Sequence, residues 1–333
     1  MTQYDIIGLG NALLDLTIAV QESFLESIDL VKGTMTLVDE ERYTRILTKI
    51  RELPSEKSSG GSSSNTIKGV SILGGKGAFM GMIGHDSYGK KYEDELNGFN
   101  VKTFLSKTNK NTGTAITFIT SDGERTFATY LGASIEFAYK NIEEDAIKNS
   151  KIIHIEGFFL EPPQHRKAAL QAMTIAKNNG VKISVDLSDP HLINRNKEFF
   201  KEVLQNYVDI VFVNEHEAKA FTGCEEEDAV NILSEYCDVS IVKLGSKGSI
   251  IKHHDRVTNT QTVHNVPIQK VKVVNTNGAG DSYAAGILYC IANDIPMQKA
   301  GKIASYISSR VVSIPEATLS HSIADEVKKI VDE

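Results

Sequence analysis

The stretch NTNGAGDSYAAG (residues 275–286) combines small residues and an acid in a pattern that can do chemistry. Three small residues stand together at Gly278, Ala279 and Gly280. Asp281 follows them, at the start of a segment with helical apolar spacing. Small residues allow close approach to the backbone, and a first helical turn leaves N–H groups that attract anions. Asp281 could then be a base beside a bound phosphate, although a tight loop before a core helix explains these residues equally well.

Three other patterns come close to known sites but lack essential residues. GLGNAL, after the first apolar run, has Leu13 where a dinucleotide-binding fingerprint needs its third glycine. GVSILGGKGA places Lys76 one residue too late for a phosphate-binding P-loop, and no Ser or Thr follows it. His253 and His254 have no partner at metal-ligand spacing. These patterns therefore favour neither a dinucleotide enzyme nor a zinc site.

The bulk composition limits the possible partners. The 333 residues suit one large domain or a domain with an insertion, and the net charge of −7 without a basic run argues against nucleic acid. Cys224, Cys237 and Cys290 lie far apart and are expected to be free thiols. The chain opens without a signal pattern and contains no membrane-length apolar run. We expect a cytoplasmic protein with no membrane partner.

Strand-like and helix-like segments alternate along most of the chain, beginning with YDIIGLG at 4–10. Further strands are predicted at 78–84, 151–157, 181–187, 208–214 and 239–245, and helices at 39–52, 65–75, 88–98, 164–179, 196–206, 215–222, 279–292, 297–312 and 322–332. This alternation predicts an α/β fold with a doubly wound, mostly parallel sheet covered by helices on both faces.

Two stretches without helices of their own interrupt this alternation. Residues 15–20 and 34–38 are predicted as short strands, and 113–131 as a hairpin turning at SDG. We expect them to form a small β-lid from residues 15–38 and 113–134. The large α/β nucleotide- and substrate-binding domain would then comprise 1–14, 39–112 and 135–333. The Ser- and Gly-rich segment 55–65 is either a flexible linker or a structured turn into a helix.

Four motifs in order resemble those of the ribokinase-like, or phosphofructokinase-B, family of carbohydrate and nucleoside kinases. They are GGSSSN (60–65), NEHEA (214–218), VKLGSKG (242–248) and NTNGAGDSY (275–283). Within this family the chain is most similar to adenosine kinases, through GNALLD (10–15), GFFL (157–160), DLSDP (186–190), VDIVFVNEHEA (208–218) and AGKIASYI (300–307). The resemblance implies ATP-dependent phosphorylation of a primary alcohol, most simply the 5′-hydroxyl of a nucleoside.

The resemblance also implies roles for residues near the transferred phosphoryl group. Asp281 matches the general base, and the N–H groups of Gly278, Ala279 and Gly280 match the anion hole. Arg125, on the lid hairpin, matches an arginine that reaches the phosphates on closure, although a lone hairpin arginine is more often a solvated charge.

On the nucleotide side, the matching residues are Asn214, Lys243, Gly245, Gly248, Gly280 and, by looser alignment, Lys302. Glu217 matches an acid that orders Mg²⁺ through water, although outside this set of motifs Asn214 and Glu217 would be explained as a helix cap and its acidic first turn. The expected cofactors are therefore ATP and Mg²⁺.

On the substrate side, Asp15 matches an acid that accepts hydrogen bonds from paired ribose hydroxyls. Asn11, Gly61 and Asn65 line the same sugar pocket, and the residues expected near a base are Met35, Leu37, Thr129, Leu131 and Phe159. Phe159, rather than Phe158, is expected as the stacking face, although both could simply end a buried strand.

The chain departs from the family pattern at Asn275, where relatives have an acid that contributes to a monovalent-cation site. Activation by potassium is therefore in doubt. Two alternatives to a nucleoside kinase remain: a kinase of a free sugar such as ribose, fructose or a sugar acid, and a nucleotide-binding regulator without catalysis. The chain could be a monomer or a homodimer.

Overall fold

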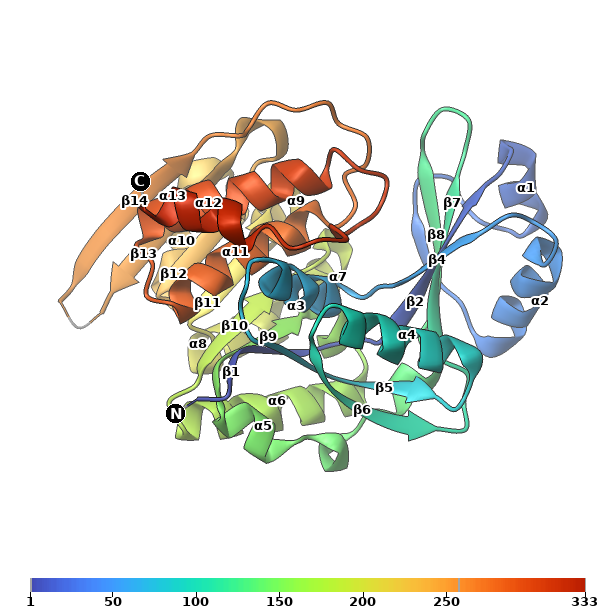
Figure 1. Ribbon diagram of the computed structural model, residues 1–333, viewed down its shortest axis with the longest axis horizontal. Helices are drawn as coiled ribbons and strands as arrows, with labels where there is room; N and C mark the ends of the chain where they lie inside the picture. Colours follow the sequence, from blue (N-terminus) through green and yellow to red (C-terminus); the bar gives the residue numbers. More distant parts are fainter. Residues whose placement is uncertain (1, 257, 333) are drawn as a thin grey trace.

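The computed structural model describes residues 2–256 and 258–332, which form two sheets (Figure 1). The larger sheet has the strand order β14-β13-β12-β11-β10-β9-β1-β5-β6. Its strands are β1 (Tyr4–Leu9), β5 (Gly77–Gly84), β6 (Lys102–Thr108), β9 (Ser150–Glu156), β10 (Lys182–Asp186), β11 (Ile210–Asn214), β12 (Val239–Lys243), β13 (Ser249–Asp255) and β14 (Thr260–Val266). Neighbours from β12 to β6 run parallel, while β13 and β14 pair antiparallel. The predicted mostly parallel sheet is confirmed.

Helices cover both faces of this sheet, as its apolar strands require. One face packs against α5 (Glu144–Lys148), α6 (Pro163–Asn178), α7 (Pro190–Arg195), α8 (Lys197–Tyr207), α9 (Glu215–Thr222) and α10 (Glu226–Tyr236). The other packs against α3 (Ser62–Ile72), α4 (Ser87–Gly98), α11 (Ala279–Ala292), α12 (Met297–Val311) and α13 (Ala324–Asp332). The sequence did not predict the helix α10. The helices α9 and α11 begin and end at the predicted residues.

The smaller sheet stands at one end of the larger unit, with the strand order β3-β8-β7-β2-β4 (Figure 1). Its strands are β2 (Leu13–Ala19), β3 (Met35–Leu37), β4 (Glu56–Ser59), β7 (Gly113–Ile119) and β8 (Arg125–Tyr130). The helices α1 (Glu22–Ser27) and α2 (Glu40–Ile50) bury their apolar sides against it. The predicted β-lid therefore exists, with its hairpin formed by β7 and β8.

The small unit is larger than the predicted 15–38 and 113–134. Asp39 caps α2 as expected, accepting a hydrogen bond from the Arg42 N–H at 2.8 Å. The buried side chains Tyr43 and Ile46 of this helix belong to the core of the smaller sheet, however. Strand β4 also pairs with β2 in this sheet, so the segment 55–65 is not a flexible linker. Assigning residues 40–59 to the large domain was wrong.

The carboxyl ends of four neighbouring strands form one row of polar residues. Glu156 ends β9 and lies opposite Asp186, which ends β10. Asn214 ends β11 and lies opposite Lys243, which ends β12. In parallel α/β sheets ligands bind outside the carboxyl ends of the strands. This edge is therefore where the fold presents polar groups to a ligand. Among the described residues, no helix is long and apolar enough to span a bilayer.

Candidate active site

A cavity of about 700 Å³ lies between the smaller sheet and the carboxyl edge of the larger one. Its lining includes all four row residues, Glu156, Asp186, Asn214 and Lys243. It also includes Asn11, Leu13, Asp15, Met35, Leu37, Gly61, Ser62, Asn65, Ala115, Thr117, Phe127, Thr129, Leu131, Phe158, Ser188, Glu217, Asn277, Gly278, Gly280 and Asp281. Most residues expected to bind substrate and most residues expected near the phosphates thus line one cavity.

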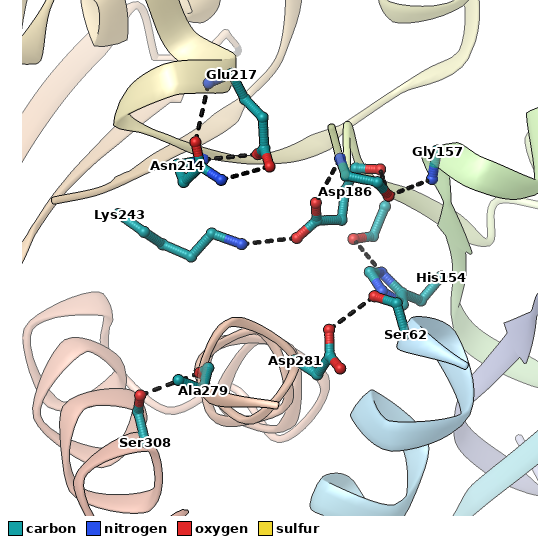
Figure 2. Close-up of polar contacts among 12 residues, drawn as sticks. Ser62, His154, Gly157, Asp186, Asn214, Glu217, Lys243, Ala279, Asp281 and Ser308 are labelled. Atoms are coloured by element: carbon teal, nitrogen blue, oxygen red, sulfur yellow. Dashed lines mark hydrogen bonds and ion pairs between the residues drawn. The ribbon is translucent and has the colours of Figure 1, made fainter. Parts of the chain in front are cut away.

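Asp281 is held in this cavity by side chains from α3. Ser62 Oγ donates to Asp281 Oδ1 at 2.7 Å (Figure 2), and Asn65 Nδ2 donates to Oδ2 at 3.1 Å. Burial raises the pKa of Asp281, and the hydrogen bond from Ser62 partly opposes this shift. A carboxylate fixed through both oxygens, with its pKa moved toward neutrality, is suited to take a proton.

The first turn of α11, beside Asp281, has a backbone that an anion can approach closely. Gly278 caps the helix with φ of +74°, and a Cβ there would lie 2.0 Å from the carbonyl oxygen of Ala317, so only glycine fits. Within the described residues, no acceptor is found for the N–H groups of Gly280 and Asp281. The carbonyl of Ala279 accepts from Ser308 Oγ at 3.0 Å, which ties this turn to α12 (Figure 2). Two N–H groups are thus free for a ligand.

Lys243 adds a positive charge above this turn. Its Nζ donates to Asp186 Oδ2 at 2.8 Å (Figure 2), and a Cβ placed on Gly280 would lie 3.2 Å from the same Nζ. Burial lowers the pKa of Lys243, but the charges of Asp186 and Glu217 outweigh this and raise it. The ammonium group is therefore charged and next to the free N–H groups.

Asn214 and Glu217 form a reciprocal cap at the start of α9 (Figure 2). Asn214 Oδ1 accepts from the Glu217 N–H at 2.9 Å, and the Glu217 carboxylate accepts from the Asn214 N–H at 2.7 Å. Burial, and next the charge of Asp186, raise the pKa of Glu217 to about 7. The capping role is thus realised, and the same carboxylate lines the cavity.

Asp15 also lines the cavity, as do Asn11 and Gly61. Burial raises the pKa of Asp15 to about 7, which Lys68 partly opposes. Asn11 is oriented by Glu156, whose Oε1 accepts from Asn11 Nδ2 and from its backbone N–H, both at 2.9 Å.

Side chains of the smaller sheet make the lid side of the cavity apolar. Met35, Leu37, Thr129 and Leu131 line it as expected, joined by Phe127 from β8. Met35 and Leu37 are exposed large hydrophobic residues, 41% and 50% accessible. Such an exposed apolar wall is typical of a ligand-binding surface.

The expectation that Phe159 faces this cavity was wrong. Phe159 is fully buried, stacked on His165 with ring centroids 4.3 Å apart and packed edge-on against Phe137. Phe158 lines the cavity instead. The two residues lie in a 3₁₀ turn, Gly157–Leu160, and not at the end of a strand, and in this turn Phe158 rather than Phe159 faces the cavity.

Several predicted residues lie outside the lining of the cavity. These are Arg125, Gly245, Gly248, Ala279 and Lys302. Lys302 is exposed on α12, and Gly245 is exposed in the turn after β12. Arg125 starts β8, at the far end of the hairpin from Leu131. These residues would reach a ligand only if the ligand extended beyond the cavity or the lid moved.

Three residues that the sequence did not single out are central to the site. Ser62 holds Asp281, Asp186 holds Lys243, and Glu156 holds Asn11. A usable signal existed for the acids, because each is the last but one residue of a predicted strand, close to the strand end where α/β folds bind ligands. Ser62 carries no such signal, since serine is common at any helix start.

Asn275 makes two side-chain hydrogen bonds, one of which an acid could not make. Its Nδ2 donates to the carbonyl oxygen of Pro315, and its Oδ1 accepts from the Asn277 N–H at 2.7 Å. The amide thus links the segment before α11 to the loop after α12. A carboxylate could not donate to Pro315, so this arrangement does not fit an acid-based cation site.

The chain was compared with known proteins. The family described as pfkB family carbohydrate kinase matches residues 24–323. Adenosine kinase 2 of Arabidopsis thaliana is 26% identical over 337 residues, covering 93% of this chain and 95% of the relative. Probable fructokinase-5 of the same plant is 32% identical over 248 residues, covering 72% and 75%. The structure of the adenosine kinase from Sinorhizobium meliloti has a TM-score of 0.87 at 29% identity, covering 98% of this chain and 99% of that one.

The family match includes every strand of the two sheets except β1 and β2, and it includes the segments that carry Asp281, Glu217 and Lys243. The structural likeness covers nearly the whole of both chains. The predicted resemblance is confirmed: this chain belongs to the pfkB family of carbohydrate kinases.

Proposed function

We propose that the chain transfers the γ-phosphoryl group of ATP to the 5′-hydroxyl of a nucleoside, with adenosine as the foremost substrate. One observation carries this proposal: a single cavity joins a held carboxylate and a helix N-terminus at one end to an apolar wall at the other. The first end suits a reacting hydroxyl and phosphate, and the second suits a planar base. Asp15 lies between them and can accept hydrogen bonds from two ribose hydroxyls.

Asp281 acts as the base in this proposal. It takes the proton from the attacking hydroxyl as the new P–O bond forms and the bond to ADP breaks. Ser62 and Asn65 fix the orientation of its carboxylate. The free N–H groups of Gly280 and Asp281, with the ammonium group of Lys243, stabilise the negative charge of the transferred group.

A net negative cavity explains why Mg²⁺ would be needed. Acids along the lining include Asp15, Glu156, Asp186, Glu217 and Asp281, against the one lysine. Mg²⁺ would neutralise phosphate charge when bound. In the described part of the chain, no three His, Cys, Asp or Glu side chains come together to enclose a metal. Since Mg²⁺ keeps several waters and uses few protein carboxylates beside phosphates, Glu217 and Asp186 fit as its outer ligands.

On the substrate side, Phe158 replaces Phe159 as our proposed stacking face. Base–aromatic stacking contributes about 1–3 kcal/mol per base. The side chains of Met35, Leu37 and Phe127 offer no polar partner to a free sugar. Among the described residues of the strands beside them, only Thr117 and Thr129 line the cavity with hydroxyl groups. Sugar hydroxyls left unpaired against the apolar side chains would cost about 1–3 kcal/mol each.

A kinase of a free sugar is the second candidate. It is favoured by the 32% identity to probable fructokinase-5, which exceeds the identity to adenosine kinase 2. The probable sugar kinase from Rhizobium etli also has a TM-score of 0.90 at 29% identity, with 99% of each chain covered. In this case the apolar wall would meet no base.

The test is ATP consumption with Mg²⁺ over matched panels of purine nucleosides, pyrimidine nucleosides and free sugars. We expect kcat/KM for adenosine to exceed that for ribose and fructose by about 10²-fold or more, because the free energies of base stacking and apolar burial add together. A higher kcat/KM for any free sugar would favour the second candidate. ATP hydrolysis that no acceptor stimulates would contradict both.

A further inference from the structure

Lys68 is a buried lysine that the proposed chemistry does not use. It lies on α3, and only 2% of its surface is accessible. Its Nζ donates to the carbonyl oxygen of Ser59 at 2.6 Å and to Ser59 Oγ at 3.1 Å. The same Nζ lies 5.6 Å from the centre of the Phe99 ring. Lysines are almost never fully buried unless their charge is compensated, so this position calls for an explanation.

The partner of Lys68 lies where the two structural units join. Ser59 is the last residue of β4 in the smaller sheet, opposite Leu14 of β2. Only Gly60 and Gly61 separate it from α3 of the larger unit. One ammonium group therefore ties α3 to the end of a lid strand across two glycines, the residue type with the greatest backbone freedom.

Asp15 rests directly on this junction. A Cβ placed on Gly60 would lie between 2.2 and 2.4 Å from the three carboxyl atoms of Asp15, so the carboxylate packs against the Gly60 backbone. Tyr92 of α4 donates to the Gly60 carbonyl oxygen at 3.2 Å and fixes the same residue from the opposite side. Any shift of Ser59 would move the surface against which Asp15 is placed.

The charged groups that act on Asp15 come from three elements. Lys68 on α3 favours the carboxylate, while Asp281 on α11 and Glu95 on α4 oppose it. Tyr92 also interacts with Asp15. Lys68 is the one cation in this set, and Glu95, Asp15 and Asp281 in turn favour its ammonium form against the cost of burial.

We propose that Lys68 is a positioning residue for substrate binding, which fixes the β4–α3 junction under Asp15 and places a positive charge near its carboxyl group. This inference rests on the proposed function in one respect, namely that Asp15 binds substrate hydroxyls. A buried lysine with only a structural role would stabilise the fold but would leave the titration of Asp15 unchanged.

The direct test follows the side-chain carboxyl of Asp15 by ¹³C NMR in the substrate-free protein, with Asp15→Asn used to assign its signal. Since burial already raises the pKa of Asp15 to about 7, removing the neighbouring cation in Lys68→Met should move its midpoint to higher pH. Glu95→Gln is the matched control of opposite sign, because loss of that acid should move the midpoint to lower pH. Ser59→Ala keeps the charge and should leave the midpoint near that of the wild type.

Kinetics give the second readout. If Lys68→Met increases the proton affinity of Asp15 about ten-fold, the ionised fraction of Asp15 at pH 7 falls. KM for adenosine should then rise about five-fold. The rise should shrink below about two-fold near pH 9, where Asp15 is ionised in both proteins. The change should fall on KM rather than on kcat.

An unchanged or lowered Asp15 midpoint in folded Lys68→Met would overturn the inference. If that variant does not fold, Glu95→Gln provides the test. An unchanged or higher Asp15 midpoint in Glu95→Gln would contradict the proposal that the charges of Lys68 and Glu95 act on Asp15 in opposite directions. Failure of the wild type to phosphorylate nucleosides would sink the proposed function but would leave the NMR result interpretable.

Discussion

Asp281 differs from an ordinary helix-start acid because both of its oxygens are engaged by α3. An N-terminal acid that only completes a helix dipole contributes about 0.3–1 kcal/mol to stability and has no need of two side-chain donors. The donors instead fix the direction in which the carboxylate faces the cavity. We infer that this residue is held in this geometry for proton transfer rather than for helix stability.

The variant Asp281→Asn should lower kcat by roughly 10²–10⁴-fold, because an amide cannot take the proton. ATP affinity, measured by calorimetry with a non-hydrolysable analogue, should change little, since the N–H groups of the first turn remain. Near-normal turnover by the variant would remove Asp281 from the proposed mechanism.

Phe158 and Phe159 form a matched pair of neighbours with different surroundings. Phe158→Ala should lower kcat/KM for adenosine about ten-fold through loss of stacking, with little change in thermal stability. Phe159→Ala should lower the free energy of unfolding by about 3–5 kcal/mol, because it empties a site in the core beside His165. Urea unfolding and steady-state kinetics on both variants check this. The reverse pattern would restore the sequence prediction and contradict the structure.

At the scale of elements, long periodic segments were predictable and short polar ones were not. The helices α9 and α11 follow from capping residues and apolar spacing that act locally. Strand β4, with the sequence EKSS, has no apolar alternation and becomes a strand only because β2 lies beside it. The site residues that belong to a sequence motif, such as Asp281 and Lys243, were predictable. The contacts of Glu156, Asp186 and Ser62 were not, because they depend on the packing of strands and helices that are distant in sequence.

The link between the segment before α11 and the loop after α12 gives a prediction for Asn275→Asp. The new carboxylate would face the Pro315 carbonyl oxygen that the amide now binds, and loss of this exposed hydrogen bond should cost about 0.5–1.5 kcal/mol. A monovalent cation could bridge the two oxygens. We therefore expect the variant to gain activity and thermal stability in potassium chloride, while the wild type responds little.

The control for this comparison is a bulky organic cation at equal ionic strength. Strong activation of the wild type by potassium, with none from the organic cation, would show that backbone carbonyls alone form a cation site and would contradict the account of Asn275.

At the scale of the whole molecule, the two sheets hold different parts of the site. The larger unit carries Asp281 on α11 and Lys243 at the end of β12, and the smaller sheet carries Asp15 and the apolar wall. Arg125 belongs to the smaller unit and lies outside the cavity lining. Its guanidinium would meet phosphates bound in the cavity if the smaller sheet moved toward the larger one.

We therefore expect nucleoside and ATP analogue together to shorten the distance between spin labels at the exposed positions Asp122 and Lys302, measured by pulsed electron resonance. Arg125→Ala should lower kcat by roughly 10³-fold, as loss of an arginine finger does, with KM for adenosine nearly unchanged. Equal distances with and without ligands, together with normal kcat in the variant, would exclude closure through Arg125.

The most direct measurement of the central claim is the identity of the phosphorylated product. The purified chain would be incubated with ATP, Mg²⁺ and an equimolar mixture of adenosine, ribose and fructose, and the products followed by ³¹P NMR. We predict that the new phosphomonoester signal is that of adenosine carrying phosphate on its 5′-oxygen, coupled to the two C5′ protons. Accumulation of a sugar phosphate while adenosine stays unmodified would contradict the account.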